Sequence, residues 1–335
     1  MIVKPHGGEL IDRVLSAKER EAILSFADKF FSLEIDEEKA IEVQNIATGV
    51  FSPLKGFMNQ EDYREVVHNS RLASGHAWTL PIVLPVDRET AKKFAKNDTI
   101  ILRTRERVVA SMQVEDVFAW DFEEYAQNVF GTTDLKHPGV QQVKAGGELF
   151  VGGSINFLSE PITHFPAYYL TPRETRVLFK EKKWNTVVGF QTRNVSHLGH
   201  EYVQKSAQSI VDGLFINPVI GKKKPGDFTD EVILDSYKAL IDEYYARERT
   251  AMSILQFEMR YAGPKEAIFH AIVRKNFGCS HFIIGRDHAG VGSYYHPFAA
   301  QKIFDYFPDL GITPMFFMSF FFCKKCNSIA NDKTC

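Results

Sequence analysis

The chain has little cysteine, no long apolar run and almost no net charge, and each shortage excludes a class of protein. Four cysteines in 335 residues cannot form the dense disulfide framework of a small secreted domain. The longest apolar candidate, Met315 to Phe322, has about the length of a strand and cannot span a membrane. A net charge of 40 − 42 = −2 provides no general field for nucleic acid, so any anion must be bound locally.

Two further absences concern targeting and nucleotide chemistry. Residues 1–10 lack the apolar segment of a signal peptide, so we expect a cytoplasmic protein. No G-x-x-x-x-G-K-[ST] sequence is present, which argues against a fused P-loop kinase. The composition that remains, 44% hydrophobic and 24% charged residues, is ordinary for a globular protein.

Length and local pattern together indicate two domains, because 335 residues exceed one ordinary hydrophobic core. The pattern of expected strands and helices changes between Pro161 and Pro172. Before this boundary the chain reads as short strands and turns, with strands expected at 78–86, 99–105 and 108–118 and helices at 18–31 and 62–69. We therefore expect a β-rich N-terminal domain over residues 1–165.

Strands and helices alternate after the boundary. The expected strands are 186–190, 214–220, 251–256 and 281–284, and the expected helices are 173–182, 198–212, 229–247 and 264–277. This alternation predicts an α/β domain, residues 166–320, with a parallel sheet covered by helices on both faces. In such sheets ligands bind beyond the carboxyl ends of the strands.

The first strand of this domain leads into Gln191-Thr192-Arg193-Asn194-Val195-Ser196-His197-Leu198-Gly199-His200. Two histidines three residues apart lie on one face of a first helical turn, and Gly199 permits a close approach to the backbone. The helix N-terminus adds free N–H groups and the positive end of its dipole. The pattern His-x-Gly-His is the signature of nucleotidyl-transferring α/β domains, which cleave ATP between the α and β phosphates.

A second loop, Gly285-Arg286-Asp287-His288-Ala289-Gly290-Val291-Gly292, follows the strand at 281–284. Its cation, imidazole and free N–H groups suit a phosphate or a second oxyanion. Each feature also has a structural interpretation: the histidines as a structural pair, this loop as a tight turn, Lys222-Lys223-Lys224 as a solvated loop, and Met315 to Phe322 as a core strand.

Taken together, the motifs resemble the ATP sulfurylase (sulfate adenylyltransferase) family along nearly the whole chain. The matching stretches are Gln191 to Asn194 with His197 and His200, Met259 to Pro264 with Ala267 to Asn276, Gly285 to Gly290, Gly49 to Met58, and Gly131 to Asp134 with His137 to Val140. The resemblance implies a PUA-like N-terminal domain and a Rossmann-like catalytic domain. It implies the reaction of ATP with sulfate to give adenylyl sulfate and pyrophosphate.

The resemblance also implies roles for individual residues. Arg193 and the backbone N–H of Ala289 would bind sulfate, with Gln191 beside them, because a guanidinium fork suits a tetrahedral oxyanion. Thr192, Arg193 and Asn194 would orient sulfate and the α-phosphate, while His197 and His200 would stabilise the departing pyrophosphate as donors or cations. The nucleotide would be held by Gly285, Arg286, Asp287 and His288, with Met318 near adenine.

No general base is required, because sulfate is already fully ionised near neutral pH. The barrier comes from bringing two anions together in line, so positioning and cationic stabilisation are the expected strategy, with Mg²⁺ arriving on ATP.

Cys323, Cys326 and Cys335 form a pattern typical of three ligands of a tetrahedral, structural Zn²⁺ site. In the bacterial and archaeal enzymes of the resembled family a histidine follows as fourth ligand, so we expect that ligand beyond Cys335 and interpret 321–335 as the incomplete start of a C-terminal segment. Three unrelated reduced cysteines remain the alternative, and Cys279 is expected in the core.

The chain departs from the family pattern at Val195, where proline is usual, and at Leu198, where arginine is frequent. We expect activity to survive both changes. Two other functions stay open: a non-catalytic nucleotide or sulfonucleotide sensor, and another His-x-Gly-His adenylyltransferase with a different acceptor. A homodimer is expected on base rates alone.

Overall fold

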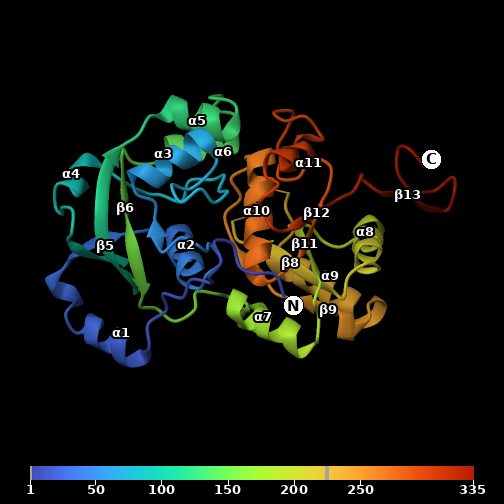
Figure 1. The fold of residues 1–335 in the computed structure, drawn as a ribbon, viewed down its shortest axis with the longest axis horizontal. Coiled ribbons are helices and arrows are strands. Elements are labelled where there is room, and N and C mark those ends of the chain that lie inside the picture. Colours follow the sequence, from blue (N-terminus) through green and yellow to red (C-terminus); the bar gives the residue numbers. More distant parts are fainter. Residues whose placement is uncertain (1, 223–225) are drawn as a thin grey trace.

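A computed structural model describes residues 2–222 and 226–335. They form two lobes that lie side by side, with helix α10 (Pro264–Phe277) at the boundary between them (Figure 1). No helix among these residues is long and apolar enough to cross a membrane.

The N-terminal lobe is built on a six-stranded mixed sheet in the order β1-β4-β5-β6-β2, with β3 paired to β6. Its strands are β1 (Phe31–Glu34), β2 (Gly56–Phe57), β3 (Leu84–Val86), β4 (Thr99–Arg103), β5 (Val108–Ala119) and β6 (Leu149–Phe157). Its helices are α1 (Ala17–Leu24), η1 (Ala27–Lys29), α2 (Glu37–Ala47), α3 (Gln60–Asn69), α4 (Arg88–Ala91), α5 (Phe122–Phe130) and α6 (Pro138–Lys144). Asp36 and Asn59 cap α2 and α3, because their side-chain oxygens accept free N–H groups of the first turn.

The C-terminal lobe is built on a second six-stranded sheet, in which every pair is parallel. Its strands are β7 (Val187–Thr192), β8 (Gly213–Ile220), β9 (Thr250–Met252), β10 (Leu255–Gln256), β11 (His281–Ile284) and β12 (Thr313–Phe316). Its helices are η2 (Pro166–Tyr168), α7 (Pro172–Glu181), α8 (Leu198–Gln208), α9 (Asp230–Tyr244), η3 (Arg247–Arg249), α10, α11 (Ala299–Lys302) and η4 (Ile303–Tyr306).

The strand order β10-β8-β7-β11-β12 places a topological switch point between β7 and β11. The chain moves outward from β7 through β8 in one direction, and returns to add β11 on the other side of β7. Crevices at such points receive ligands in open parallel sheets. The two loops singled out in the sequence follow the neighbouring parallel strands β7 and β11, so they lie at the same edge of the sheet, and the space between them is called the crevice below.

The two lobes share one hydrophobic core. Phe51 and Trp78 of the N-terminal lobe contact the ring of Phe269 on α10, at centroid distances of 5.3 and 5.4 Å. The Asn276 side chain of α10 donates to the carbonyls of Val50 and Ser52, both at 3.0 Å. Because apolar and polar contacts both cross the boundary, the lobes form one folded unit rather than two tethered ones.

The mixed architecture, a β-rich lobe followed by a parallel α/β lobe, confirms the predicted fold class. The helix at 264–277 and the strand at 281–284 have the predicted termini, and α9 begins at Asp230 with Thr229 as its cap. Pro264 at the first helical position and Gly278 just past the end explain the accuracy at α10.

Three element predictions were wrong. Only Leu84–Val86 of the stretch 78–86 is a strand, and the helix predicted over 18–31 ends at Leu24. Met315 to Phe322 is not a core strand: β12 ends at Phe316, and both Phe316 and Phe322 are largely exposed. The Phe316 ring packs on Phe304 at a centroid distance of 5.8 Å, and Phe322 belongs to the terminal hairpin rather than to the sheet.

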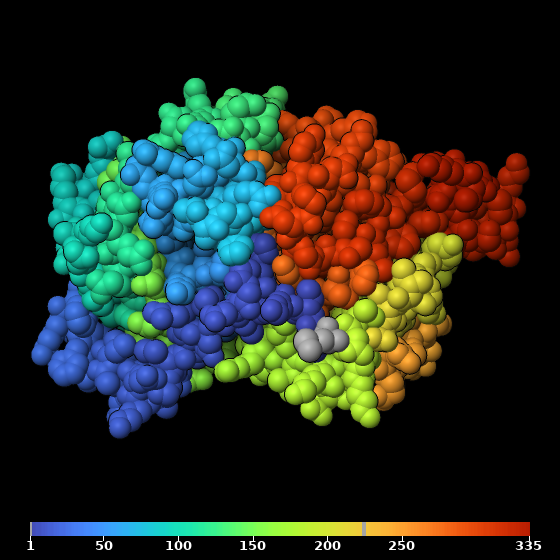
Figure 2. Space-filling view, in the orientation of Figure 1, coloured from blue at the N-terminus to red at the C-terminus, as the bar shows by residue number. Residues whose placement is uncertain are grey.

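The chain ends in a small antiparallel hairpin of β13 (Phe321–Cys323) and β14 (Ser328–Ala330). It projects beside α8, away from the rest of the C-terminal lobe (Figures 1 and 2).

Candidate active site

The first loop turns sharply as it leaves β7. The hydroxyl Oγ1 of Thr192 accepts from the Asn194 N–H at 3.1 Å and lies 3.0 Å from the Asn194 carbonyl oxygen, to which it donates. The Ser196 N–H donates to Ser236 Oγ of α9 at 3.2 Å. These bonds fix the loop although Val195 occupies a position where a proline would restrict the backbone.

His197 is the N-cap of α8. Its Nδ1 accepts from the N–H groups of Gly199 and His200 at 3.1 and 3.3 Å, so the ring proton must sit on Nε2. We expected these N–H groups to be free for a ligand, and that prediction is wrong. The chain instead presents an Nε2–H donor, which forms no hydrogen bond with any residue that the structure describes.

The rings of His197 and His200 are stacked, with centroids 3.7 Å apart and planes inclined by 23°. Burial, together with the neighbouring His197, lowers the pKa of His200 to about 4, and burial also lowers the pKa of His197. Both imidazoles are therefore neutral near pH 7 without ligand. In this form they offer N–H donors, which is one of the two roles that the sequence left open.

Gly199 is required by the protein itself. A Cβ atom at this position would lie 2.5 Å from the carbonyl oxygen of Phe320 and 3.0 Å from the His197 ring. We expected a ligand to approach the backbone at this glycine, but the segment that follows β12 lies there instead. The same contact brings the neighbourhood of Met318, which is half-buried, to the start of α8.

Arg193 lies at the crevice but is already engaged. Its guanidinium donates to the Tyr261 hydroxyl at 2.6 Å and forms an ion pair with Asp227 at 3.2 Å. It also lies over the Tyr261 ring, 5.7 Å from the centroid. An incoming oxyanion would have to share the guanidinium with Asp227.

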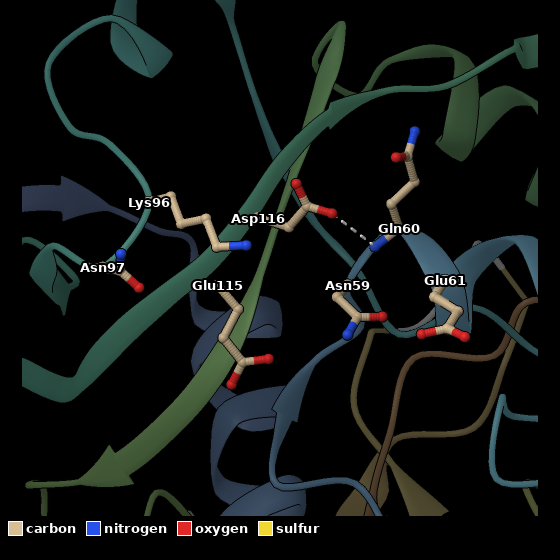
Figure 3. A pocket seen from close by; sticks show the side chains of 7 residues that line it. All are labelled: Asn59, Gln60, Glu61, Lys96, Asn97, Glu115 and Asp116. Atoms are coloured by element: carbon tan, nitrogen blue, oxygen red, sulfur yellow. Dashed lines mark hydrogen bonds between the residues drawn. The ribbon is translucent and has the colours of Figure 1, made fainter.

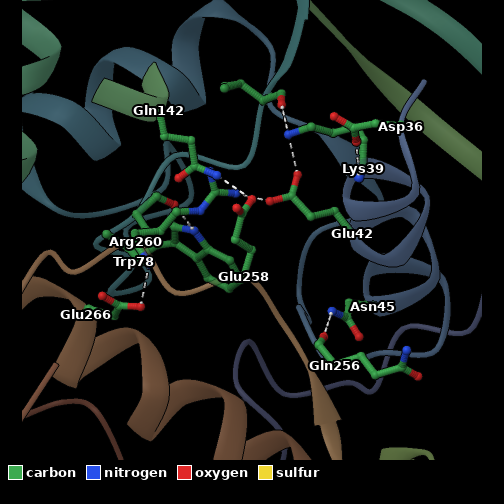
Figure 4. A network of polar contacts seen from close by, with 12 residues as sticks. Asp36, Lys39, Glu42, Asn45, Trp78, Gln142, Gln256, Glu258, Arg260 and Glu266 are labelled. Atoms are coloured by element: carbon green, nitrogen blue, oxygen red, sulfur yellow. Dashed lines mark hydrogen bonds and ion pairs between the residues drawn. The ribbon is translucent and has the colours of Figure 1, made fainter. Parts of the chain in front are cut away.

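Tyr261 is held by the N-terminal lobe through its neighbour Arg260. The Arg260 guanidinium pairs with Glu42 of α2, which also accepts from Lys39 at 2.5 Å (Figure 4). Burial alone would raise the pKa of Glu42, but Lys39 and Arg260 outweigh it and hold that pKa below its usual value. Gln142 of α6 donates to Glu258 in the same network. The N-terminal lobe therefore fixes the loop that holds Arg193.

A cavity of about 820 Å³ lies between the lobes at this network. Arg193, Tyr261, Glu258 and Arg260 line it from the C-terminal lobe, and Lys39 and Gln142 are among its lining from the other. Arg193, which belongs to the first loop, thus also lines the interlobe cavity.

The second loop carries left-handed backbone at Asp287 and Ala289, with φ of 55° and 57°. His288 between them is not left-handed, and such alternation turns successive N–H groups toward one point, as in anion-binding nests. The Ala289 carbonyl accepts from Gly263 N–H at 3.0 Å, which ties this loop to the one that carries Tyr261. The Ala289 N–H has no partner among the described residues.

The remaining predicted residues lie at the same crevice or close to it. Gln191, at the end of β7, points its Nε2 at Met259 Sδ (3.8 Å) and leaves a buried Oε1 without a partner. Arg286 is exposed, and its guanidinium lies 3.8 Å from the Asp332 carboxylate. A Cβ atom at Gly285 would meet no other atom within 4 Å. Of the lysine run, Lys222 lies 3.8 Å from Glu258, while Lys223 and Lys224 lie outside the described residues.

A hollow of about 420 Å³ also occurs at the start of α3 in the N-terminal lobe (Figure 3). Amides and carboxylates line it, including Asn59, Glu61, Glu115 and Asp116, and none of the predicted site residues takes part. It does not belong to the crevice.

Cys323, Cys326 and Cys335 gather at the terminal hairpin. Their sulfur atoms all lie within 4.8 Å of one another, with Cys326 and Cys335 2.8 Å apart. Three thiol groups at this spacing can bind a metal ion, and thiolate ligands favour Zn²⁺ among common divalent ions. Cys279 is fully buried, as predicted, and burial raises its pKa to about 12.

Sequence reasoning missed the residues that hold the predicted ones. Asp227 and Tyr261 lie 34 and 68 positions from Arg193, and Glu42 lies 218 positions from Arg260. A single sequence carries no periodic signal for such distant pairs. The local signal that existed was the stretch Met259 to Pro264, which was matched to the family without a role for Arg260 or Tyr261.

Comparison with family models divides the chain into two matches. Residues 3–160 match a PUA-like domain, and residues 166–335 match the ATP-sulfurylase family.

Full-length relatives agree with these matches. The chain is 53% identical over its whole length to a sulfate adenylyltransferase of Pyrococcus abyssi and 52% identical to one of Staphylothermus marinus, covering 88% of each. A bacterial sulfate adenylyltransferase from Halothermothrix orenii is 45% identical. The hexameric APS kinase from Thiobacillus denitrificans has the same fold, with a TM-score of 0.76 at 22% identity over all of this chain and 60% of that one.

Proposed function

The chain belongs to the ATP-sulfurylase family, and we propose that it transfers the adenylyl group of ATP to sulfate through the crevice between β7 and β11. A sulfate oxygen attacks the α-phosphorus, the bond from that phosphorus to the bridging oxygen breaks, and pyrophosphate leaves with its electron pair. The reaction is reversible. The observation that carries the proposal is that two donor-rich loops meet at the switch point of the parallel sheet. The relatives of the chain are sulfate adenylyltransferases, which agrees with it.

Sulfate binds at the Arg193 side of the crevice. The guanidinium supplies charge-assisted hydrogen bonds, the unpartnered N–H of Ala289 supplies another, and Gln191 lies beside them. Arg193 is held by Tyr261 and Asp227, so its position is set before sulfate arrives. A preset cation needs little reorganisation when charge develops in the transition state.

The triphosphate lies against the start of α8. Thr192 and Asn194 orient the α-phosphate, while His197 and His200 donate to the oxygens of the departing pyrophosphate. The tautomer fixed by the α8 cap makes the His197 Nε2–H a donor for this purpose. Gly285, Arg286, Asp287 and His288 hold the nucleotide, and Met318 lies near the base. Mg²⁺ enters with ATP and offsets the charge of its phosphates.

The assay for this function is ATP formation from adenylyl sulfate and pyrophosphate, read with luciferase. We expect turnover that Arg193→Ala abolishes, with ATP binding largely retained in calorimetry. Lys238→Ala is a matched control, because Lys238 is a surface cation paired with Asp242 on α9. Absence of turnover with adenylyl sulfate still bound would instead favour the sensor alternative.

The terminal cysteines hold Zn²⁺ with a structural role, together with a fourth ligand from outside the three. The metal would close the β13–β14 hairpin beside α8 and bring no chemistry to the crevice. Metal analysis of the purified protein should give one zinc per chain, lost in Cys326→Ser with adenylyl transfer retained. The expected homodimer is tested by light scattering.

A further inference from the structure

Helix α10 carries a buried polar stripe that adenylyl transfer does not use. Glu266 and His270 are one turn apart on it, and both are completely buried. Apolar side chains would bury at lower free-energy cost, so polar groups at these two positions call for a specific hydrogen-bonding role. Their neighbour in space is His288 of the nucleotide loop.

The three side chains form a line. His270 Nε2 lies 3.4 Å from Glu266 Oε1, and His270 Nδ1 lies 3.1 Å from His288 Nε2. Glu266 in turn accepts from the N–H groups of Arg260 at 3.0 Å and Ala262 at 2.9 Å. The line therefore runs from the loop that holds Arg193 to the loop assigned to the nucleotide.

The hydrogen positions along this line follow from Glu266. Burial raises the pKa of Glu266, and the two backbone N–H groups that its oxygens accept, together with Arg260, oppose that rise. His270 Nε2 forms no hydrogen bond that meets ordinary geometry, but it lies 3.4 Å from Glu266 Oε1. A carboxyl oxygen at this distance attracts an N–H and repels a lone pair, so we assign the ring proton to Nε2 and the lone pair to His270 Nδ1. A lone pair on Nδ1 requires that His288 Nε2 donate to it.

Both imidazoles are neutral near pH 7. Burial, with His270 and Arg274 nearby, lowers the pKa of His288 to about 3, although Glu266 opposes this shift. Burial and Arg274 also hold the pKa of His270 well below its usual value. A neutral His288 that donates through Nε2 keeps a lone pair on Nδ1, which bonds to no residue that the structure describes.

We propose that Glu266 and His270 fix His288 as its Nε2–H tautomer, so that His288 Nδ1 accepts a hydrogen bond from an –OH or –NH₂ group of the bound nucleotide. The inference rests on the proposed function, because it takes the second loop as the nucleotide site. Phosphate oxygens offer no proton, so this contact is to the sugar or the base. His288 contacts the ligand, and Glu266 and His270 are positioning residues.

The first test needs no activity. ¹⁵N spectra of histidine-labelled protein should show His270 and His288 as neutral Nε2–H tautomers, assigned by their loss in His270→Phe and His288→Leu. His137 and His197 are internal references, because their Nδ1 atoms cap helices and force the same tautomer. A proton on His288 Nδ1 would overturn the proposal.

The second test finds the ligand group through equilibrium binding. Calorimetry compares ATP with its 2′-deoxy, 3′-deoxy and 6-desamino analogues on the wild type and on His288→Leu. We expect one analogue to bind the wild type up to about tenfold more weakly than ATP, the cost of one neutral hydrogen bond. His288→Leu should bind that analogue and ATP alike. No difference for any analogue would refute the contact.

His270→Phe separates positioning from direct contact. This variant keeps His288 but removes the Nδ1 atom that accepts its hydrogen bond. The preference for ATP over that analogue should therefore shrink as in His288→Leu. Ile272→Val, also buried on α10, should leave the preference intact. An unchanged preference in His270→Phe would refute the relay. Loss of turnover with these binding ratios intact would instead count against the proposed function.

Discussion

Helices α6 and α8 begin with the same side-chain arrangement and use it differently. His137 and His197 each cap a helix through Nδ1, accepting two N–H groups at 3.1 and 3.3 Å. His137 is completely buried, and its Nε2 lies 3.1 Å from both the Tyr261 carbonyl and the Tyr295 hydroxyl. His197 is exposed, and its Nε2 has no such partner in the described part of the chain. A local motif thus stays structural when its outer nitrogen is satisfied, and becomes available for chemistry when it is not.

The strongest way to separate the two roles is His197→Asn. Asparagine is a good N-cap, so α8 should keep its stability, but the outward N–H donor is lost. Removing one donor to developing transition-state charge costs about 10²- to 10³-fold in turnover. Turnover from adenylyl sulfate and pyrophosphate measures the loss, and a thermal melt close to that of the wild type shows that the cap survives. Normal turnover would show that His197 only caps.

The next prediction concerns how the unfolding free energy depends on pH through His200, the stacked neighbour of His197. Its pKa is about 4 in the fold against the ordinary 6.5, so the unfolded chain binds the proton first as pH falls. The stability that depends on a neutral His200 is fully present above pH 6.5, and it is lost as the pH falls toward 4. Between pH 7 and 4.5, the wild type should lose about 2–3 kcal/mol of unfolding free energy more than His200→Gln. Urea titrations of both proteins check this, and parallel curves would contradict it.

His137→Asn tests the structural member of the pair. The cap should survive, but the shorter side chain cannot reach Tyr261 or Tyr295, and a buried gap remains. We expect a loss of about 2 kcal/mol in unfolding free energy. Turnover of the folded fraction should stay near that of the wild type. A large fall in kcat with unchanged stability would reverse the roles assigned to the two histidines.

The smallest change is Tyr295→Phe, which removes one partner of His137 and leaves the carbonyl of Tyr261 in place. The expected cost is about 1 kcal/mol, the net value of an ordinary hydrogen bond. Chemical denaturation resolves a change of this size. Tyr294→Phe is a matched comparison, because the Tyr294 hydroxyl bonds to Asp134 at the surface and should cost less.

The sequence predicted the two loops of the crevice because local signals mark them. Pro264 and Gly278 bound α10, and a buried strand precedes each glycine-containing loop. It could not predict which nitrogen of His197 is free, since that depends on cap geometry. Nor could it predict that Asp227 and Tyr261 hold Arg193, because both contacts depend on how distant segments pack.

The pairing of Glu42 with Arg260 has a consequence for building hybrid enzymes. The two family matches meet between residues 160 and 166, which suggests a junction there for joining halves of two relatives. The halves, however, carry opposite members of a buried ion pair beside the loop that fixes Arg193. A hybrid that takes α2 from one parent and Arg260 from another needs both members to match in length and charge, or it leaves one charge buried alone. Both lobes of a hybrid should therefore be taken from the same parent.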